Sequence, residues 1–114
     1  MQPGKYNILM QRRADFLLQL QFRDGSGAAI DLSDWGAYSQ IWDKKRIEQY
    51  SEFEIIYNDP EDGKIQLYLE AAEATKLPSE CFYDVMLENP DGLKQYYLEG
   101  LIYVSEGYTD PSWN

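Results

Sequence analysis

The sequence has 114 residues, a length typical of one domain, and 44% of them are hydrophobic, which is enough for one core. Twenty acidic residues against ten basic ones give a formal net charge of −10, which repels phosphate backbones and anionic lipids. We therefore expect no nucleic-acid partner and no membrane partner. No apolar run approaches the ~20 residues of a membrane helix and no signal-peptide pattern opens the chain, so we expect the protein to be made and kept in a cytoplasm until it is used.

Histidine is absent, and cysteine occurs once, at Cys81. Without imidazole the chain has no Ser-His-Asp or Cys-His catalytic arrangement and lacks the commonest metal ligand. A single cysteine cannot form a disulfide within the chain, and we interpret Cys81 as a small apolar strand residue rather than a nucleophile. These absences favour a protein that is not an enzyme, with no catalytic residue, no cofactor and no bound metal.

Alternating apolar and polar residues predict strands along most of the chain. The clearest alternation places Phe16, Leu18, Leu20 and Phe22 on one face, because four large apolar residues at period two fit no helix. After a short N-terminal lead-in at residues 1–4, we predict strands at 5–11, 16–23, 36–42, 49–57, 64–69, 80–88 and 93–104. Residues 28–35 are expected to form a corner or a helical turn between two of these strands.

Residues 80–104 predict an antiparallel hairpin around which the rest is organised. The cluster Asn89-Pro90-Asp91-Gly92 joins its two strands, with Pro90 and Gly92 supplying the backbone angles of a tight turn. In its second strand, strict alternation separates two faces. The first face holds Tyr96, Leu98, Gly100, Ile102 and Val104, and the second holds Gln95, Tyr97, Glu99, Leu101 and Tyr103.

One helix is expected, at residues 70–76, because this segment is alanine-rich, begins with an acidic residue and ends before Pro78. About seven strands with turn signals between them predict an all-β protein. The fold class we expect is an antiparallel β-sandwich, immunoglobulin-like or related, with one short crossover helix; a small barrel is the alternative. The sandwich domain is expected over residues 5–107, followed by a C-terminal tail at 108–114.

Short charged clusters are interpreted as ordinary turns. The two basic clusters are too short for a nucleic-acid groove, and we interpret them as solvated turns. They are Arg12-Arg13 and Lys44-Lys45-Arg46. The acidic segments at residues 59–63 and 89–92 lack the ligand spacing of a calcium loop, and hairpin turns alone account for their composition.

Aromatic residues are in excess, with ten tyrosines, four phenylalanines and three tryptophans. Phe16, Phe22, Phe53 and Trp35 are expected in the core. Other rings on strands, such as Tyr38, fit either half-buried sheet surface or a protein–protein interface, where Tyr and Trp are enriched as anchors. A surface that stacks sugars is a third interpretation. The candidate interface residues are Trp42, Tyr97, Leu101, Tyr103, Tyr108 and Trp113.

A series of short motifs follows in order along the chain and covers residues from about 5 to 107. The motifs are Ala14-Asp15-Phe16, Asp24-Gly-Ser-Gly27, Ile30-Asp-Leu-Ser-Asp-Trp35, Lys64-Ile-Gln-Leu-Tyr-Leu69, Leu77-Pro78, Tyr83-Asp84-Val85, Asn89-Pro-Asp-Gly92 and Leu98-Glu-Gly100. In this order they resemble a family of small tailed-bacteriophage virion proteins. The resemblance is to the β-sandwich domain that begins the baseplate upper proteins of some siphophages.

This resemblance implies a structural protein without enzymatic activity, located in the virion after assembly in the host cytoplasm. It implies a place in the tail, baseplate or fibre attachment, contacts with other virion structural proteins, and a homo-oligomer within the particle. A head decoration protein and a carbohydrate-binding adsorption module remain as alternatives. We expect the second hairpin face (Tyr97, Leu101, Tyr103) and the tail from Tyr108 to Trp113 to contact a neighbour.

Overall fold

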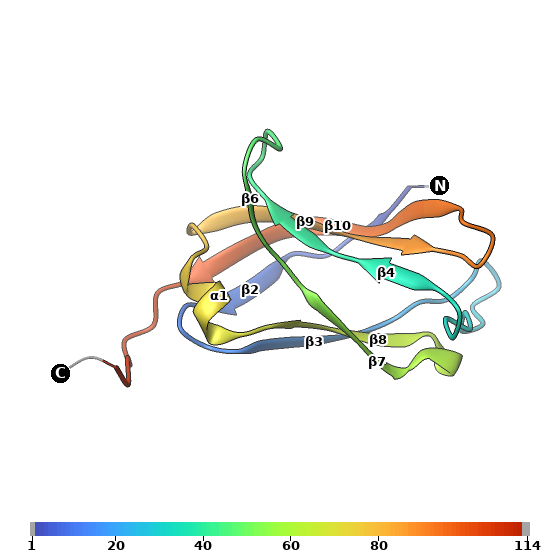
Figure 1. Ribbon diagram of the computed structural model, residues 1–114, viewed down its shortest axis with the longest axis horizontal. Coiled ribbons are helices and arrows are strands. Elements are labelled where there is room, and N and C mark those ends of the chain that lie inside the picture. The colour runs from blue at the N-terminus through green and yellow to red at the C-terminus, as the bar shows by residue number, and fades with distance from the viewer. Residues whose placement is uncertain (1, 113–114) are drawn as a thin grey trace.

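Ten strands, one short α-helix and one 3-10 turn make up residues 2–112, the part of the chain that the computed structural model describes (Figure 1). The elements are β1 (Gly4–Lys5), β2 (Ile8–Gln11), β3 (Phe16–Gln21), β4 (Gly36–Tyr38), β5 (Gln40–Trp42), β6 (Gln49–Glu52), β7 (Glu54–Asp59), η1 (Pro60–Asp62), β8 (Lys64–Leu69), α1 (Ala71–Thr75), β9 (Glu80–Glu88) and β10 (Lys94–Ser105). The predicted all-β class and the single short helix are confirmed. Ten strands are present instead of seven because three predicted strands are each divided into two.

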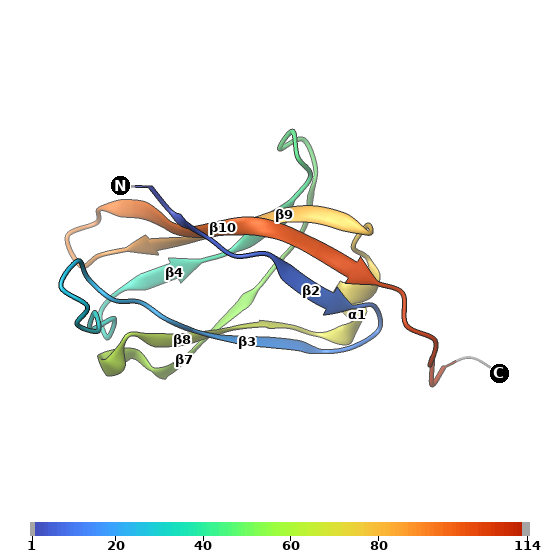
Figure 2. The same ribbon diagram turned by 180° about the vertical axis from the view of Figure 1, so that it is seen from behind.

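The strands form two sheets that share one core. The large sheet follows the order β1-β10-β9-β5-β6, with β2 also paired to β10 and β4 also paired to β9, and the small sheet follows β3-β8-β7. Figures 1 and 2 show the two sheets as two layers, with α1 at one end between them. No helix in residues 2–112 is long and apolar enough to cross a membrane.

The expected antiparallel arrangement is wrong for the large sheet, which is mixed. Strands β1 and β2 both run parallel to β10, whereas the β9–β10 hairpin and the small sheet are antiparallel. Side chains alternate between the two faces in parallel and antiparallel strands alike. The alternation of residues 5–11 therefore predicted a strand without indicating which way it would pair.

The break between β1 and β2 lies where the N-terminal segment, which runs along one edge of β10, passes Gly100. The Tyr6 amide donates to the Glu99 carbonyl oxygen at 3.0 Å, and the Leu101 amide donates to Asn7 Oδ1 at 3.0 Å. A Cβ atom at Gly100 would lie 2.0 Å from the Tyr6 carbonyl oxygen. The absence of a side chain at Gly100 is therefore what allows this segment to lie against β10.

A β-bulge at Tyr97 divides β10 into two parts with opposite alternation. The pairing with β9 shifts between Tyr96 and Leu98, so Tyr97 is the additional residue. Tyr97, expected on the outer face, instead packs against the core, with edge-to-face contacts to Phe22 and Trp35 at ring-centroid distances of 5.8 and 6.4 Å. Tyr96, expected inward, is 49% exposed. The face assignment of residues 95–97 is thus corrected, while Leu101 and Tyr103 alternate as predicted.

Both sheets contribute apolar side chains to the core, as the alternating pattern predicted. Buried residues come from β2, β5, β8, β9 and β10, and the predicted core rings Phe22 and Phe53 are buried with them. Phe16 and Trp35 pack against this core. Cys81 is fully buried, which confirms its interpretation as an apolar strand residue.

The interpretation of Arg12 as part of a solvated turn is wrong. Its side chain is 14% exposed, and its guanidinium donates to the carbonyl oxygens of Leu77 at 2.6 Å and Thr75 at 3.1 Å. The same guanidinium pairs with Glu106 at 2.7 Å. Arg12 therefore connects the end of α1 to the C-terminal segment, and charge-assisted hydrogen bonds of this kind are stronger than neutral ones.

We predict that Gly100→Ala destabilises the protein by about 1–3 kcal/mol, because the added methyl group forces the N-terminal segment away from β10. The control is Gly25→Ala, since a Cβ at Gly25 meets no atom within 4 Å. The control should change the free energy of unfolding by at most about 0.5 kcal/mol. Urea denaturation of both variants measures the difference, and equal stabilities would contradict the close approach at Gly100.

The buried thiol gives a second prediction. Burial, with a smaller effect from the Glu80 carboxylate, raises the pKa of Cys81 to about 11. In the unfolded chain the thiol has its ordinary pKa of about 8.5. Between this pH and the pKa of the folded state, the thiol ionises only in the unfolded state, so ionisation favours unfolding. Relative to Cys81→Ala, the wild type should lose up to ~1.4 kcal/mol of stability per pH unit in this window. Urea denaturation at several pH values measures the free energy of unfolding of both proteins. If this free energy had the same pH dependence in the wild type and in Cys81→Ala, the prediction would be contradicted.

Candidate functional site

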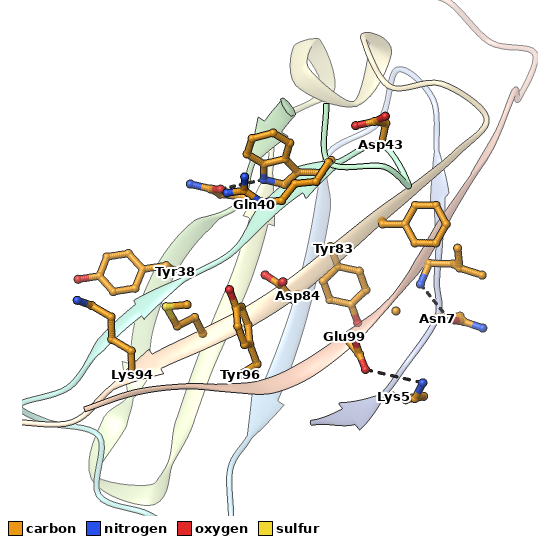
Figure 3. A pocket seen from close by; sticks show the side chains of 16 residues that line it. Lys5, Asn7, Tyr38, Gln40, Asp43, Tyr83, Asp84, Lys94, Tyr96 and Glu99 are labelled. Atoms are coloured by element: carbon orange, nitrogen blue, oxygen red, sulfur yellow. Dashed lines mark hydrogen bonds and ion pairs between the residues drawn. The ribbon is translucent and has the colours of Figure 1, made fainter. Parts of the chain in front are cut away.

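A groove on the outer face of the large sheet is the candidate functional site (Figure 3). Its volume is about 730 Å³, within the range of roughly 300–1,000 Å³ that is usual for ligand sites. The floor is formed by outward-facing residues of β4, β5, β9 and β10, whose inward-facing neighbours belong to the core. The groove is lined by Lys5, Asn7, Tyr38, Gln40, Trp42, Asp43, Arg46, Phe82, Tyr83, Asp84, Met86, Lys94, Tyr96, Glu99, Gly100 and Leu101.

The strand register arranges the floor of the groove in three rows that cross the strands. The first aromatic row consists of Tyr38, Met86 and Tyr96, which are direct cross-strand partners. The acidic row consists of Asp84 and its partner Glu99. The second aromatic row consists of Trp42, Phe82 and Leu101. Along β9 the rows are two residues apart, so neighbouring rows are separated by about 6–7 Å.

Polar contacts hold the rings at both ends of the groove. The Tyr38 hydroxyl donates to Glu88 Oε1 at 3.0 Å, and the Trp42 indole nitrogen donates to Gln40 Oε1 at 2.9 Å. The Arg46 guanidinium lies 4.3 Å from the centre of the Trp42 ring, a distance that gives a cation–π interaction. The rings are thus fixed before any ligand arrives, which reduces the entropy that binding would cost.

Two carboxylates face each other in the acidic row. Burial, and then the neighbouring charge of Glu99, raise the pKa of the Asp84 carboxyl above its ordinary value, and Arg46 opposes this shift. Like charges on directly opposed strand residues destabilise a sheet. The repulsion between Asp84 and Glu99 therefore lowers the stability of the folded state.

The N-terminal segment forms one wall of the groove. Lys5 lies at the edge of the groove, and its ammonium nitrogen is 3.7 Å from Glu99 Oε1. The side-chain oxygen of Asn7 accepts a hydrogen bond from the Leu101 amide. The parallel pairing of β1 with β10 places both residues there. Because this pairing did not follow from the sequence pattern, neither residue was a candidate before the fold was known.

The structure does not bring the predicted interface residues together in one place. Trp42 and Leu101 lie together in the second aromatic row, and Tyr38 lies in the first aromatic row. Tyr103 lies outside the groove, beside Leu9, whereas Tyr97 packs against the core. Tyr108 is fully exposed beyond β10. Trp113 lies outside the described residues.

Sequence reasoning missed Phe82, Asp84, Met86 and Tyr96 as groove residues. The first three are the outward positions of β9, and the alternation with Cys81, Tyr83, Val85 and Leu87 contains this information. The position of Tyr96 depends on the bulge at Tyr97, which has no clear signal in the sequence. Within residues 2–112, no group of three or more Cys, Asp and Glu side chains is placed to hold a metal ion.

Among known proteins, the comparisons find likenesses to solved structures. No protein-family model matches the sequence, and no curated protein matches it. Among solved structures, the chain is similar to the crystal structure of the Lin-41 filamin domain, with 17% sequence identity and a TM-score of 0.49. The similarity covers 87% of this chain and 84% of that chain. A likeness at this level carries no argument about function.

We predict that Asp84→Asn stabilises the protein at pH 7 by about 0.2–1 kcal/mol, because it removes one of two opposed carboxylates. The raised pKa of Asp84 means that the folded state binds its proton more tightly than the unfolded state does. The ionised side chain therefore destabilises the fold at pH 7, and the advantage of the variant shrinks as Asp84 becomes protonated at low pH.

Urea denaturation at pH 7 and at pH 4 measures this difference. Asp91→Asn is the matched control, because the same substitution is made at an exposed turn residue of the same hairpin. An Asp84→Asn variant that is less stable than the control at pH 7 would contradict the proposed repulsion.

Proposed function

We propose that this chain is a non-enzymatic structural protein of a tailed-bacteriophage virion, which contacts neighbouring virion proteins through the outer face of the large sheet. The motif order that resembles small virion β-sandwich proteins supports the place in the particle. We propose the tail, baseplate or fibre attachment as that place, with a homo-oligomer there. We also propose that the two layers are an immunoglobulin-like β-sandwich, which the two sheets around one core support.

The observation that carries the proposed contact surface is the amount of apolar side chain left on this one sheet face. The two aromatic rows are continued by Tyr103, 40% exposed, and by its cross-strand partner Leu9, 68% exposed. Monomeric proteins rarely leave a large contiguous apolar surface uncovered, and such surfaces mark interaction sites. Tyr, Trp and Met are also the residue types enriched at protein interfaces.

The charge of the chain supports the same proposal. A net charge of −10 keeps free subunits apart in solution and opposes binding to nucleic acid and anionic membranes. Partners that cover the groove face therefore supply both the apolar contact and the compensating charge. This combination suits a protein that is soluble before assembly and buried afterwards.

A second candidate function is a carbohydrate-binding adsorption module. Rings beside carboxylates and amides, as in Tyr96, Asp84 and Gln40, are groups that stack on sugars and hydrogen-bond their hydroxyls. The apolar continuation of the face through Leu9 and Tyr103 favours a protein partner over a glycan, because a sugar ring does not need so much apolar surface.

Incorporation into particles tests the proposed function. We expect purified wild-type particles to contain the chain, and particles made with Leu101→Asp or Tyr103→Asp to contain at least about tenfold less, because a carboxylate is then buried against the partner. Quantitative immunoblotting of purified particles measures the incorporation.

Leu17→Asp is the matched control, because Leu17 is an exposed leucine on the outer face of the small sheet. This variant should be incorporated like the wild type, and circular dichroism should give the same β spectrum for all variants. Wild-type particles without the chain would refute the virion role, and equal incorporation of all variants would refute the contact surface.

A further inference from the structure

The groove combines two apolar ends with a negative centre, and this pattern defines the chemistry of what it binds. The acidic row lies between the two aromatic rows, and its carboxylates are direct cross-strand partners. Two opposed carboxylates on a half-covered surface repel each other, and a positive group placed over them removes that repulsion. The face that is apolar at both ends therefore carries a position for one cation at its centre.

Three basic residues, Lys5, Arg46 and Lys94, line the groove. Lys5 pairs with Glu99, Arg46 lies over the Trp42 ring, and Lys94 stands opposite Glu88 in the strand register. Among the ion pairs of residues 2–112, none involves the Asp84 carboxylate. The charge of Arg46 acts on Asp84 without forming an ion pair with it, so the carboxylate can still pair directly with a positive group of another molecule. Rings of Tyr96 and Trp42 on either side are also favourable neighbours for a cation.

The spacing of the rows matches an extended peptide that lies along the strands of the sheet. Neighbouring rows are two strand residues apart, and in an extended peptide the side chains on one face are also two residues apart. A peptide with residues i, i+2 and i+4 facing the groove places the central residue over the acidic row. Its outer two residues then lie over the aromatic rows.

We infer that the groove binds an extended segment of a partner protein with the pattern apolar–x–Lys/Arg–x–apolar, its basic side chain pairing with Asp84 and Glu99. This inference deepens the proposed function, because it names the chemistry of the partner that covers the face. The net charge of −10 additionally attracts a basic segment over a longer distance. Figure 3 shows Asp84 in the middle of the lining side chains, where such a segment would pass.

The test uses the purified chain and defined peptides, so it does not depend on the virion. The probe is acetyl-Tyr-Ser-Arg-Ser-Leu-amide, and two controls replace arginine by glutamine or move arginine next to the tyrosine. Titrations are followed by the NMR shifts of backbone amides in β9 and β10. We expect the probe to shift these amides and to bind more tightly than either control peptide, by roughly threefold to tenfold.

Variants of the protein complete the test. Asp84→Asn should weaken binding of the probe by a similar factor, whereas Asp91→Asn in the nearby turn should bind it like the wild type. Equal binding of the three peptides, or no shifts in the groove with any of them, would overturn the inference. Maltohexaose that shifts the same amides while the probe does not would assign the groove to a glycan instead. Self-association through the groove that excludes the probe would assign it to a second copy of the chain.

These outcomes remain separate from the fate of the proposed function. Particles that lack the chain would refute the virion role and leave the peptide result unchanged. Incorporation that depends on Leu101 but not on Asp84, together with no preference for the arginine probe, would refute the charge pattern and keep the contact surface.

Discussion

The β-bulge at Tyr97 is the local feature on which the rest of this structure depends. Two adjacent tyrosines, Tyr96 and Tyr97, would lie on opposite faces of any strand, but the bulge decides which of them is inside. Tyr97 enters the core against Phe22 and Trp35, and Tyr96 joins the groove. After the bulge, Glu99 and Leu101 continue on the same outer face as Tyr96. The bulge thus adds the Tyr97 ring to the core. It also places Tyr96, Glu99 and Leu101, one from each row of the groove, on the same outer face.

The second constraint is the close approach of the N-terminal segment to β10 at Gly100. Gly100 admits the Tyr6 carbonyl, and Asn7 replaces the backbone partner that the Leu101 amide would have in a regular ladder. The Tyr83 hydroxyl donates to the same Tyr6 carbonyl at 2.6 Å from within the core. These contacts join the core to the groove wall, so that Lys5 and Asn7 reach the binding face.

The groove shows the usual conflict between stability and function. Opposed carboxylates at Asp84 and Glu99, and exposed apolar side chains around them, cost stability or solubility in the free protein. In the complex that we propose, a partner with apolar and basic groups covers the face and removes both costs. On the opposite sheet, the pocket beside Glu54 and Tyr68 has a volume of only about 200 Å³. The outer face of that sheet carries polar side chains such as Gln19 and Gln66 beside the exposed Leu17. This asymmetry between the two faces is the reason why we propose the large sheet as the binding side.

The amino-acid sequence by itself determined the all-β class, the extents of β8 and β9, the hairpin turn at residues 89–92, the short helix and the core role of Phe22, Phe53 and Cys81. These features follow from local alternation, turn chemistry and hydrophobicity. Only the tertiary structure decided that β1 and β2 run parallel to β10, that Tyr97 lies inside, that Arg12 binds backbone carbonyls, and that Asp84 faces Glu99. The physical reason is that direction of pairing, bulges and cross-strand neighbours depend on contacts between segments far apart in the chain, and period-two alternation is the same for every such pairing.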